Sequence, residues 1–337
     1  MTLAALAVSA QPAQAAQGTL GPMYYLTTFG ARGAIVDPLL WGLFILAIVV
    51  VVVISGLVIV GIMLRARSVP FGQGQRVDVA RGEGGLAWVY GGLIVTTIIL
   101  LGFVAWTMMT MVSLSSPATP TAFTIHVTGT QWWWKLNYEA KDPSKNFVTA
   151  NEIHIPVGVP VRLVLSSDDV IHSFWVPALA GKTDLIPNRT NHMWIEGDHV
   201  GVYRGQCAEY CGTQHAHMAL RVFVDTPADF QAWWNNELRE AMPPQSQSAQ
   251  EGQKQFLQQC GICHTVRGTP AHGKVGPELT HVMSRSTLAA DMLPNTVANL
   301  SGWIANPQQI KPGSRMPNLD LSAPQLAAIR DYLLTLK

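Results

Sequence analysis

The four cysteines of this sequence form two tight pairs, each followed closely by a histidine. The first pair lies in the stretch QCAEYCGTQHAHM, which contains Cys207, Cys211, His215 and Met218. Thiolate and thioether sulfur are soft ligands that favour Cu(I), and imidazole also binds copper. Two thiolates on one loop can bridge two copper ions, so that both metals share the charge of one electron. The spacing therefore predicts a dinuclear copper site.

A second imidazole must come from elsewhere in the chain, and His172 is the best candidate. It lies in DDVIHSFWVP, at the end of a strand-like run and shortly before a proline, which is a usual place for a loop to begin. Two alternatives stay open for Cys207 and Cys211: a disulfide, or zinc binding with two histidines. Both leave Met218 without a role. We interpret His217 as a bystander, because alternation along an extended segment turns it away.

The second cysteine pair lies in the run CGICH, where Cys260, Cys263 and His264 form the C-x-x-C-H signature of covalently attached c-type haem. Two thiols at this spacing can form thioethers to both vinyl groups, and the adjacent imidazole reaches the iron from one face. Met316, in GSRMPN, is the expected second axial ligand. A His/Met pair raises the reduction potential, as an electron carrier toward oxygen chemistry requires.

Two alternatives apply to this haem signature. Met283 and Met292 are rival axial ligands, but Met316 has the Met-Pro context and a following helical pattern over 323–336. A thioredoxin-like C-x-x-C would need a βαβ context, and the residues around CGICH have a helical pattern instead. The motif therefore favours haem.

The segments that must carry these sites begin with two apolar stretches at about 39–64 and 86–112, neither of which contains a charged residue. Each exceeds the ~20 apolar residues that a bilayer-spanning helix needs. The loop between them has four arginines against Asp78 and Glu83. The positive-inside rule places such a loop in the cytoplasm. Both termini and all residues after 112 are then expected outside, where copper loading and haem attachment are possible.

Composition agrees with membrane attachment, because only 13% of the residues are charged and 48% are hydrophobic. The net charge is +1, and no basic run suggests nucleic acid as a partner. Residues 1–16 include an apolar run and an Ala-Gln-Ala site typical of a cleaved signal peptide, although the basic region that normally precedes them is missing. The alternative is a disordered N-terminal tail.

After the apolar stretches the pattern changes twice. Short alternating runs from about 122 to 224, punctuated by Pro, Gly, Asn and Asp, predict an antiparallel β-sandwich. A helical stretch follows at 227–242, then a polar linker at 243–250, and residues 251–337 again read as helical. We therefore expect a membrane anchor over 17–120, a sandwich domain over 121–242 and an all-α domain over 251–337.

At this point the residues resemble two known families. The run C-x-E-x-C-x-x-x-H-x-x-M, with D-V-x-H-S upstream, resembles the CuA site of cytochrome c oxidase subunit II, which has a cupredoxin-like fold; the resemblance covers about 36–242. Residues 251–337 resemble class I cytochrome c. The first resemblance implies a set of copper ligands in which the two cysteines bridge the metals: His172, Cys207, Glu209 through its carbonyl oxygen, Cys211, His215 and Met218.

The subunit II resemblance also implies roles beyond the copper ligands. The Glu209 carboxylate would bind magnesium or manganese at the border with subunit I, which is reasonable because a hard carboxylate suits a hard cation. Trp132, in QWWW, is the position where electrons enter in that family. The family often has a glutamate three residues before a tryptophan at its second membrane helix. Gly85 stands there relative to Trp88, so the role of Glu83 in proton uptake is doubtful.

Together the two resemblances imply an electron-transfer subunit of a cytochrome c oxidase in a bacterial cytoplasmic membrane, with its copper and haem domains on the periplasmic face. Neither apolar stretch contains a histidine, so the site that reduces oxygen to water and most proton translocation must belong to a partner. The implied partners are subunit I, subunit III, a soluble cytochrome c or similar donor, and membrane lipid. The alternative function is the electron-input subunit of a copper-containing nitric oxide reductase.

The linker adds an expectation about the internal donor. A flexible tether would let the haem domain sample positions near the copper domain at an effective concentration on the mM scale. Exogenous cytochrome c is then expected to act through the fused haem rather than at Trp132.

Overall fold

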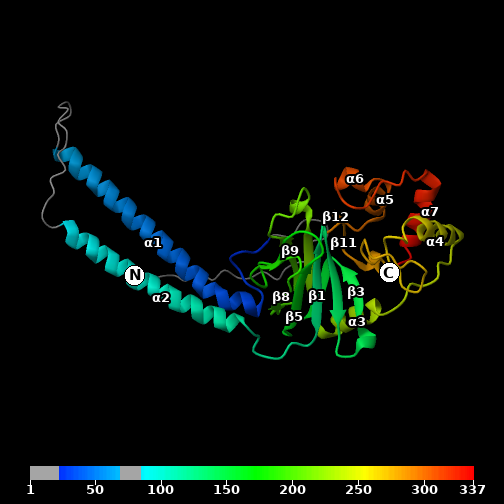
Figure 1. Cartoon of the computed structure of the whole chain (residues 1–337), viewed down its shortest axis with the longest axis horizontal. Coiled ribbons are helices and arrows are strands. Elements are labelled where there is room, and N and C mark those ends of the chain that lie inside the picture. The colour runs from blue at the N-terminus through cyan, green and yellow to red at the C-terminus, as the bar shows by residue number, and fades with distance from the viewer. Residues whose placement is uncertain (1–22, 69–84) are drawn as a thin grey trace, which may run out of the picture. The chain divides into compact units, whose positions relative to one another are not determined.

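The computed structural model describes residues 23–68 and 85–337 (Figure 1). These form two compact units: residues 23–33 with Pro117–Lys337, and Ala34–Ser116. The predicted signal peptide at 1–16 and residues 69–84 of the loop between the apolar stretches, including Glu83, lie outside the described residues. The predicted domain limits themselves stay predictions.

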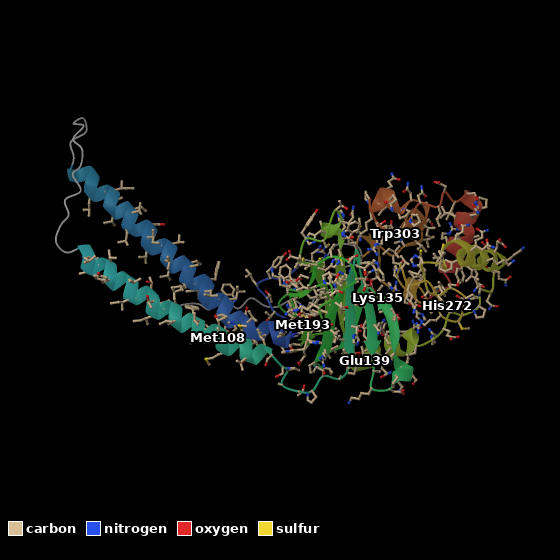
Figure 2. The ribbon with its side chains drawn as sticks, viewed as in Figure 1. Met108, Lys135, Glu139, Met193, His272 and Trp303 are labelled. Carbon is tan, nitrogen blue, oxygen red and sulfur yellow. The ribbon has the colours of Figure 1, made fainter. Side chains whose placement is uncertain are left out.

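The unit Ala34–Ser116 consists of most of α1 (Ala31–Ser68) and all of α2 (Gly85–Leu114). Within these helices Ala31–Leu64 and Leu86–Leu114 are long and apolar enough to cross a membrane. Their side chains are mostly exposed hydrocarbon, as around Met108 of α2 (Figure 2). A helix whose apolar side chains are exposed all round suits lipid as its solvent. The first helix begins eight residues earlier than predicted and includes Pro38.

The middle of the chain is a β-sandwich of two five-stranded sheets, with strand orders β3-β2-β1-β5-β8 and β4-β10-β9-β6-β7. Buried positions alternate along the strands, as in β1, because successive side chains point to opposite faces. The strands are β1 (Thr124–Thr130), β2 (Trp133–Glu139), β3 (Phe147–Ala150), β4 (Glu152–Pro156), β5 (Val161–Ser167), β6 (His172–Trp175), β7 (Thr183–Leu185), β8 (Asn191–Ile195), β9 (Gly201–Cys207) and β10 (Ala219–Asp225). A 3₁₀ turn, η1 (Pro143–Lys145), precedes β3.

The sandwich is confirmed, but it is not wholly antiparallel as predicted. Strand β1 pairs with β5 in parallel, and β10 pairs with β4 in parallel. Alternation of buried and exposed residues is the same in both kinds of pairing, so the sequence pattern does not distinguish them. The core between the sheets includes fully buried Trp134, Tyr138 and Phe174.

Helix α3 (Pro227–Glu237) follows the sandwich and is capped by Thr226, whose side chain accepts a hydrogen bond from the backbone N–H of Asp229. The C-terminal region is helical, as expected, with one two-residue strand pair. Its elements are α4 (Gln247–Gln259), η3 (Val282–Ser284), β11 (Thr287–Leu288), β12 (Leu293–Pro294), α5 (Val297–Ala305), α6 (Pro307–Ile310) and α7 (Ala323–Leu333). Helices α4 and α7 pack together around Phe256 and Tyr332, whose rings lie 5.4 Å apart.

Candidate metal centre and haem cavity

The predicted copper ligands lie on two paired strands, β6 and β9, and on the loop that follows β9. His172 is the first residue of β6, and Cys207 is the last residue of β9, which pairs with β6. The chain then forms the copper loop, residues 208–218, which contains the 3₁₀ turn η2 (His215–His217) and returns into β10. Adjacent strand ends and one short loop therefore collect ligands that are far apart in the sequence.

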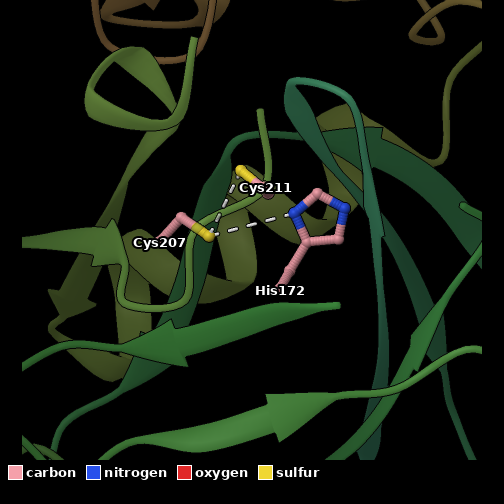
Figure 3. Close-up of side chains that lie close together, drawn as sticks. All are labelled: His172, Cys207 and Cys211. Atoms are coloured by element: carbon pink, nitrogen blue, oxygen red, sulfur yellow. Dashed lines mark hydrogen bonds between the residues drawn. The ribbon is translucent and has the colours of Figure 1, made fainter. Parts of the chain in front are cut away.

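The two thiols lie side by side, and the imidazole of His172 lies next to Cys207 (Figure 3). The Sγ atoms of Cys207 and Cys211 are 3.7 Å apart, which is much longer than a disulfide bond of ~2.05 Å. His172 Nδ1 lies 3.8 Å from Cys207 Sγ, and His215 Nδ1 lies 3.5 Å from Cys211 Sγ. This arrangement leaves room for ions between two sulfurs, with one nitrogen at each end.

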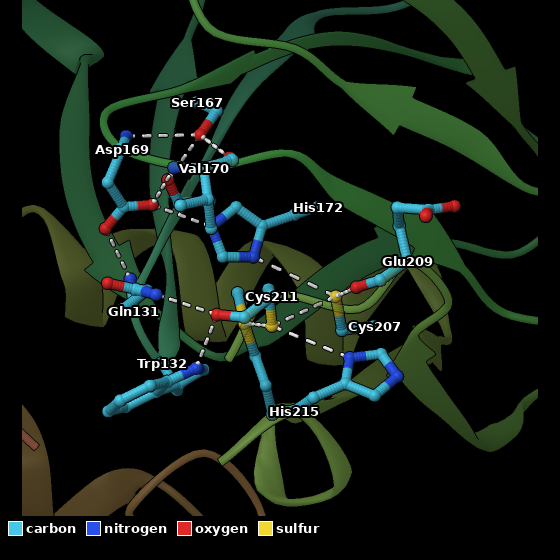
Figure 4. Close-up of polar contacts among 12 residues, drawn as sticks. Gln131, Trp132, Ser167, Asp169, Val170, His172, Cys207, Glu209, Cys211 and His215 are labelled. Carbon is cyan, nitrogen blue, oxygen red and sulfur yellow. Dashed lines mark hydrogen bonds and ion pairs between the residues drawn. The ribbon is translucent and has the colours of Figure 1, made fainter. Parts of the chain in front are cut away.

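Two weaker ligand atoms complete the set. The Sδ atom of Met218 is 3.9 Å from Cys211 Sγ, and the carbonyl oxygen of Glu209 is 3.2 Å from Cys207 Sγ. The Glu209 carboxylate is exposed and points away from the sulfurs (Figure 4). Soft sulfur, imidazole and one carbonyl form a donor set that suits copper. All six predicted residues are therefore brought together.

The pKa values of the two thiols are shifted in opposite directions. The hydrogen bond from Cys211, together with those from His172 and from backbone groups, lowers the pKa of Cys207 to about 4, against the effect of burial. The Cys207 thiolate and burial in turn raise the pKa of Cys211. Without a metal ion, the protein therefore favours the thiolate form of Cys207 only. Cys211 needs a positive charge beside it to lose its proton. A metal ion supplies that charge.

His172 is oriented by groups behind it. Its Nε2 lies 2.8 Å from Asp169 Oδ1, so that Nδ1 faces Cys207 (Figure 4). Burial alone would lower the pKa of His172, but its contacts with Cys207 and Asp169 raise it. A carboxylate behind a histidine fixes the ring that binds a metal. On the other side, Gly129 approaches so closely that a Cβ there would lie 2.7 Å from His172 Cδ2.

The C-x-x-C-H motif opens onto a cavity of about 300 Å³ in the same unit. Its lining includes Cys260, Cys263, His264 and Met316. The rival methionines are not part of this lining, and Met283 packs against the helical core instead. An apolar cavity that presents two thiols, an imidazole and a thioether matches the attachment and axial ligands of haem c.

His264 is held ready to act as an iron ligand. Its Nδ1 lies 2.8 Å from the carbonyl oxygen of Pro277. This bond makes Nδ1 the donor, and Nε2 then carries the lone pair that a metal needs. Burial lowers the pKa of His264 and keeps the ring neutral. Gly276 packs on the ring so tightly that a Cβ would lie 2.6 Å from Cε1.

Trp132 belongs to both sites. Trp132 lines the haem cavity, and its Nε1 donates a 2.9 Å hydrogen bond to the carbonyl oxygen of Cys211 (Figure 4). It is only 8% exposed, so it is not open to a soluble protein. Trp133 lines the same cavity, whereas Trp134 is buried in the sandwich and packs edge-on to His172.

Sequence reasoning missed several residues at these sites. Asp169 had a usable signal, because an acid three residues before a metal-binding histidine can hydrogen-bond it. Gln131 donates its side-chain N–H to the Cys211 carbonyl at 2.8 Å. Lys311 and Arg315 of the C-terminal domain also reach the copper domain. Nothing local in the sequence indicates such contacts. His217 lies in the 3₁₀ turn η2 and not on the extended segment from which alternation was argued, and its Nδ1 is 2.7 Å from Gln214 Oε1. Its role as a bystander stays a prediction.

The sandwich and the helical region therefore define a class: an electron-transfer protein with a cupredoxin-like domain joined to a c-type cytochrome domain. Residues 140–224 match the family of the periplasmic domain of cytochrome c oxidase subunit II, and residues 249–337 match the cytochrome c family. The chain therefore contains a domain that matches the periplasmic domain of subunit II, followed by a domain that matches cytochrome c. The two domains imply a CuA centre and haem c, and the geometry above fits both.

Individual proteins are similar to parts of this chain. Cytochrome c oxidase subunit 2 of Alkalihalophilus pseudofirmus is 40% identical over 215 residues, which cover 63% of this chain and 61% of the relative. The same subunit of Bacillus sp. PS3 is 31% identical over 225 residues and is covered to 62%. The chain thus spans somewhat less than two thirds of these relatives. A crystal structure of the periplasmic domain of subunit II of cytochrome oxidase from Bradyrhizobium japonicum is 31% identical over 36% of this chain and 96% of its own, with a TM-score of 0.33.

Proposed function

We propose that this chain is the electron-input subunit of a membrane-bound cytochrome c oxidase. Electrons would pass from a soluble cytochrome c or similar donor to the cytochrome domain, then to the copper domain, and on to a haem in subunit I, where oxygen is reduced to water with proton translocation. The observation that carries the proposal is the position of Trp132, which lines the haem cavity and hydrogen-bonds Cys211.

Each proposed ligand has a stated task. Cys207 and Cys211 would bridge two copper ions, with His172 and His215 at the two ends. Cys207, Cys211 and His172 are buried, which excludes water and limits rearrangement of the site. His264 and Met316 would hold the haem iron. When bound, the copper pair and the haem each supply a centre that accepts and releases one electron.

The other proposed partners would supply the oxygen-reducing site, for which α1 and α2 have no histidine ligands. Neither α1 nor α2 contains a histidine that could ligate haem inside a membrane. The oxygen-reducing site is therefore assigned to subunit I, with subunit III as a further partner in a bacterial cytoplasmic membrane. The exposed Glu209 carboxylate on the copper loop is assigned to a magnesium or manganese ion shared with subunit I.

Metal and haem analysis of the purified complex tests the proposal. The domain pair in this chain should carry two copper ions, with a mixed-valence signal in electron paramagnetic resonance (EPR), and one covalent haem. Cys207→Ser should remove that signal and leave the haem, whereas Cys260→Ser should weaken haem attachment and leave the copper signal. One variant thus controls for the other. A wild-type chain with zinc or a disulfide at Cys207 and Cys211 would refute the copper assignment.

A further inference from the structure

The loop that leads into Met316 lies directly on the copper domain. We name residues Lys311–Arg315 the clamp segment; it begins where α6 ends. The Lys311 Nζ donates hydrogen bonds to three carbonyl oxygens: Trp132 at 2.8 Å, His217 at 2.8 Å and Ala289 at 2.9 Å. Lys311 is only 3% exposed. Three acceptors match the three N–H donors of an ammonium group, so one side chain joins Trp132, the copper loop and the cytochrome domain.

The next residues of the clamp segment continue along the copper loop. The carbonyl oxygen of Pro312 accepts a 2.9 Å hydrogen bond from the Gln214 side chain. Gly313, with φ at +82°, packs so that a Cβ would lie 3.4 Å from Thr213 Oγ1 and 3.6 Å from the Trp132 ring. Positive φ suits glycine, which has no Cβ to clash with its own backbone. The backbone of the segment thus follows the loop that holds the copper ligands.

The last residue of the clamp segment reaches the other end of the copper site. Arg315 Nη2 lies 3.1 Å from Asp169 Oδ2, and the other oxygen of Asp169 holds His172. Asp169 Oδ2 also accepts the backbone N–H of Gln131 at 2.8 Å. An unbroken set of contacts therefore runs from Arg315, the residue before Met316, to a proposed copper ligand.

The clamp segment is braced from within its own domain. The Gln308 side-chain N–H donates to the carbonyl oxygens of Ser314 and Met316, both at 2.7 Å. Its Oε1 accepts the Gly313 N–H at 3.0 Å. The backbone position of Met316 is thereby tied to the same segment that grips the copper domain.

Other contacts join the two domains without the clamp segment. Buried Asp291 pairs with Arg221 at 2.7 Å and with Arg204 at 3.3 Å, both on the sandwich. Glu152 of the sandwich accepts backbone N–H bonds from Ser286 at 2.9 Å and from Thr287 at 3.0 Å. These contacts hold the two domains together without the clamp segment. A change in the clamp segment can therefore be tested without separating the domains.

We propose that the clamp segment positions Trp132 and the copper site on the cytochrome domain, with Lys311 and Arg315 as positioning residues for electron transfer within the chain. The inference rests on the proposed function. Each transfer moves one electron from the reduced haem to the oxidised copper pair, and no bond is made or broken. Donor and acceptor then keep one mutual geometry instead of sampling many through a flexible tether.

Arg315→Gln and Lys311→Met in the purified holo-complex test the proposal. An added photoreductant, excited by a light pulse, reduces the haem of the oxidised complex by one electron, and absorption of the haem and copper centres is followed. Both variants should slow haem-to-copper transfer at least about tenfold, a rise of ~1.4 kcal/mol in the barrier. The copper EPR spectrum of Arg315→Gln should also change, because Asp169 loses one partner. Copper and haem contents should equal wild type.

Two further variants make the outcome specific. Arg330→Gln removes an arginine that pairs with Asp331 inside α7, and it should leave the transfer rate and the copper spectrum unchanged. Arg315→Lys keeps a cation beside Asp169 and should recover most of the rate, since the present contact uses one nitrogen. If Lys311→Met fails to fold, Arg315→Gln decides.

Wild-type rates and copper spectra in Arg315→Gln would overturn the clamp proposal and leave the proposed function intact. Loss of copper from Arg315→Gln would also overturn it, because Arg315 would then retain the metal rather than set geometry. A wild-type complex in which reduced haem does not pass its electron to copper would instead refute the proposed function.

Discussion

Trp132 connects two sites, because its Nε1 hydrogen-bonds the Cys211 carbonyl oxygen and the residue lines the same cavity as His264. The two tryptophans that line this cavity, Trp132 and Trp133, therefore differ in one testable respect. In the described structure it is Trp132 that bonds a cysteine of the proposed copper pair.

Trp132→Phe is expected to slow electron transfer from haem to copper, since it deletes the N–H that joins the cavity wall to the copper loop. The loss of one buried hydrogen bond should cost about 0.5–1.5 kcal/mol of stability. A comparable rise in the barrier would lower the rate about two- to tenfold. Flash photolysis of the oxidised complex with an added photoreductant that reduces the haem measures this rate, and Trp133→Phe is the control. Equal rates in both variants would contradict a special role for Trp132.

Gly129→Ala is expected to disturb copper binding through steric pressure on His172. The new Cβ would lie 2.7 Å from His172 Cδ2 and 2.9 Å from Cγ, so the ring must move. Overpacking of this kind typically costs about 1–3 kcal/mol. Copper content and the EPR spectrum measure the effect. Gly181→Ala is the control, since a Cβ at Gly181 would meet no atom within 4 Å; equal copper contents would argue against His172 as a ligand.

Met316→His is expected to keep the covalent haem and lower its reduction potential, because a thioether ligand raises the potential relative to a second imidazole. The shift should be on the order of 0.1 V, within the ~0.8 V range that axial ligands set. A redox titration followed by haem absorption measures it. Met283→Leu, a change in the helical core outside the cavity, should leave the potential near wild type. A shifted potential in Met283→Leu with an unchanged potential in Met316→His would instead indicate Met283 as the axial ligand.

The sequence predicted the parts of this protein that local spacing encodes. Five of the six proposed copper ligands lie within residues 207–218, and the haem signature occupies 260–264, so their chemistry is visible without the fold. His172 could be found because it is the histidine of a strand-like run near a proline. The apolar stretches were also visible, although α1 extends past Pro38 to Ala31, a continuation that neighbouring groups make possible in membrane helices.

Contacts across the domains could not be predicted in this way. Lys311 and Trp132 are 179 residues apart, and Arg315 and Asp169 are 146 apart. Neither periodicity nor motif spacing relates residues at such separations. The linker pattern suggested a haem domain that samples many positions, whereas the structure has buried charged contacts, such as Asp291 with Arg221, between the domains. The contacts between the domains therefore set the position of the haem domain, which the composition of the linker could not predict.

Glu237→Gln is expected to stabilise the outer domains at neutral and alkaline pH. Burial in α3 raises the pKa of Glu237 to about 7 from its ordinary 4.5, with Glu278 and Glu152 adding to the shift and Arg285 and Arg267 opposing it. The folded state then binds more protons than the unfolded state between these two pKa values. Stability therefore falls as pH rises from about 4.5 to about 7, by about 3 kcal/mol in total for this group. The neutral amide removes that penalty.

Thermal unfolding of wild type and Glu237→Gln at pH 5 and pH 8 measures this effect. The variant should gain most at pH 8 and little at pH 5, where the wild-type carboxyl is already largely protonated. Glu240→Gln, three residues on and exposed to solvent, should show no such difference between the two pH values. If Glu237→Gln were instead less stable than wild type at pH 8, the carboxylate would be acting as a charged partner of Arg285 and Arg267, and the direction of its pKa shift would be wrong.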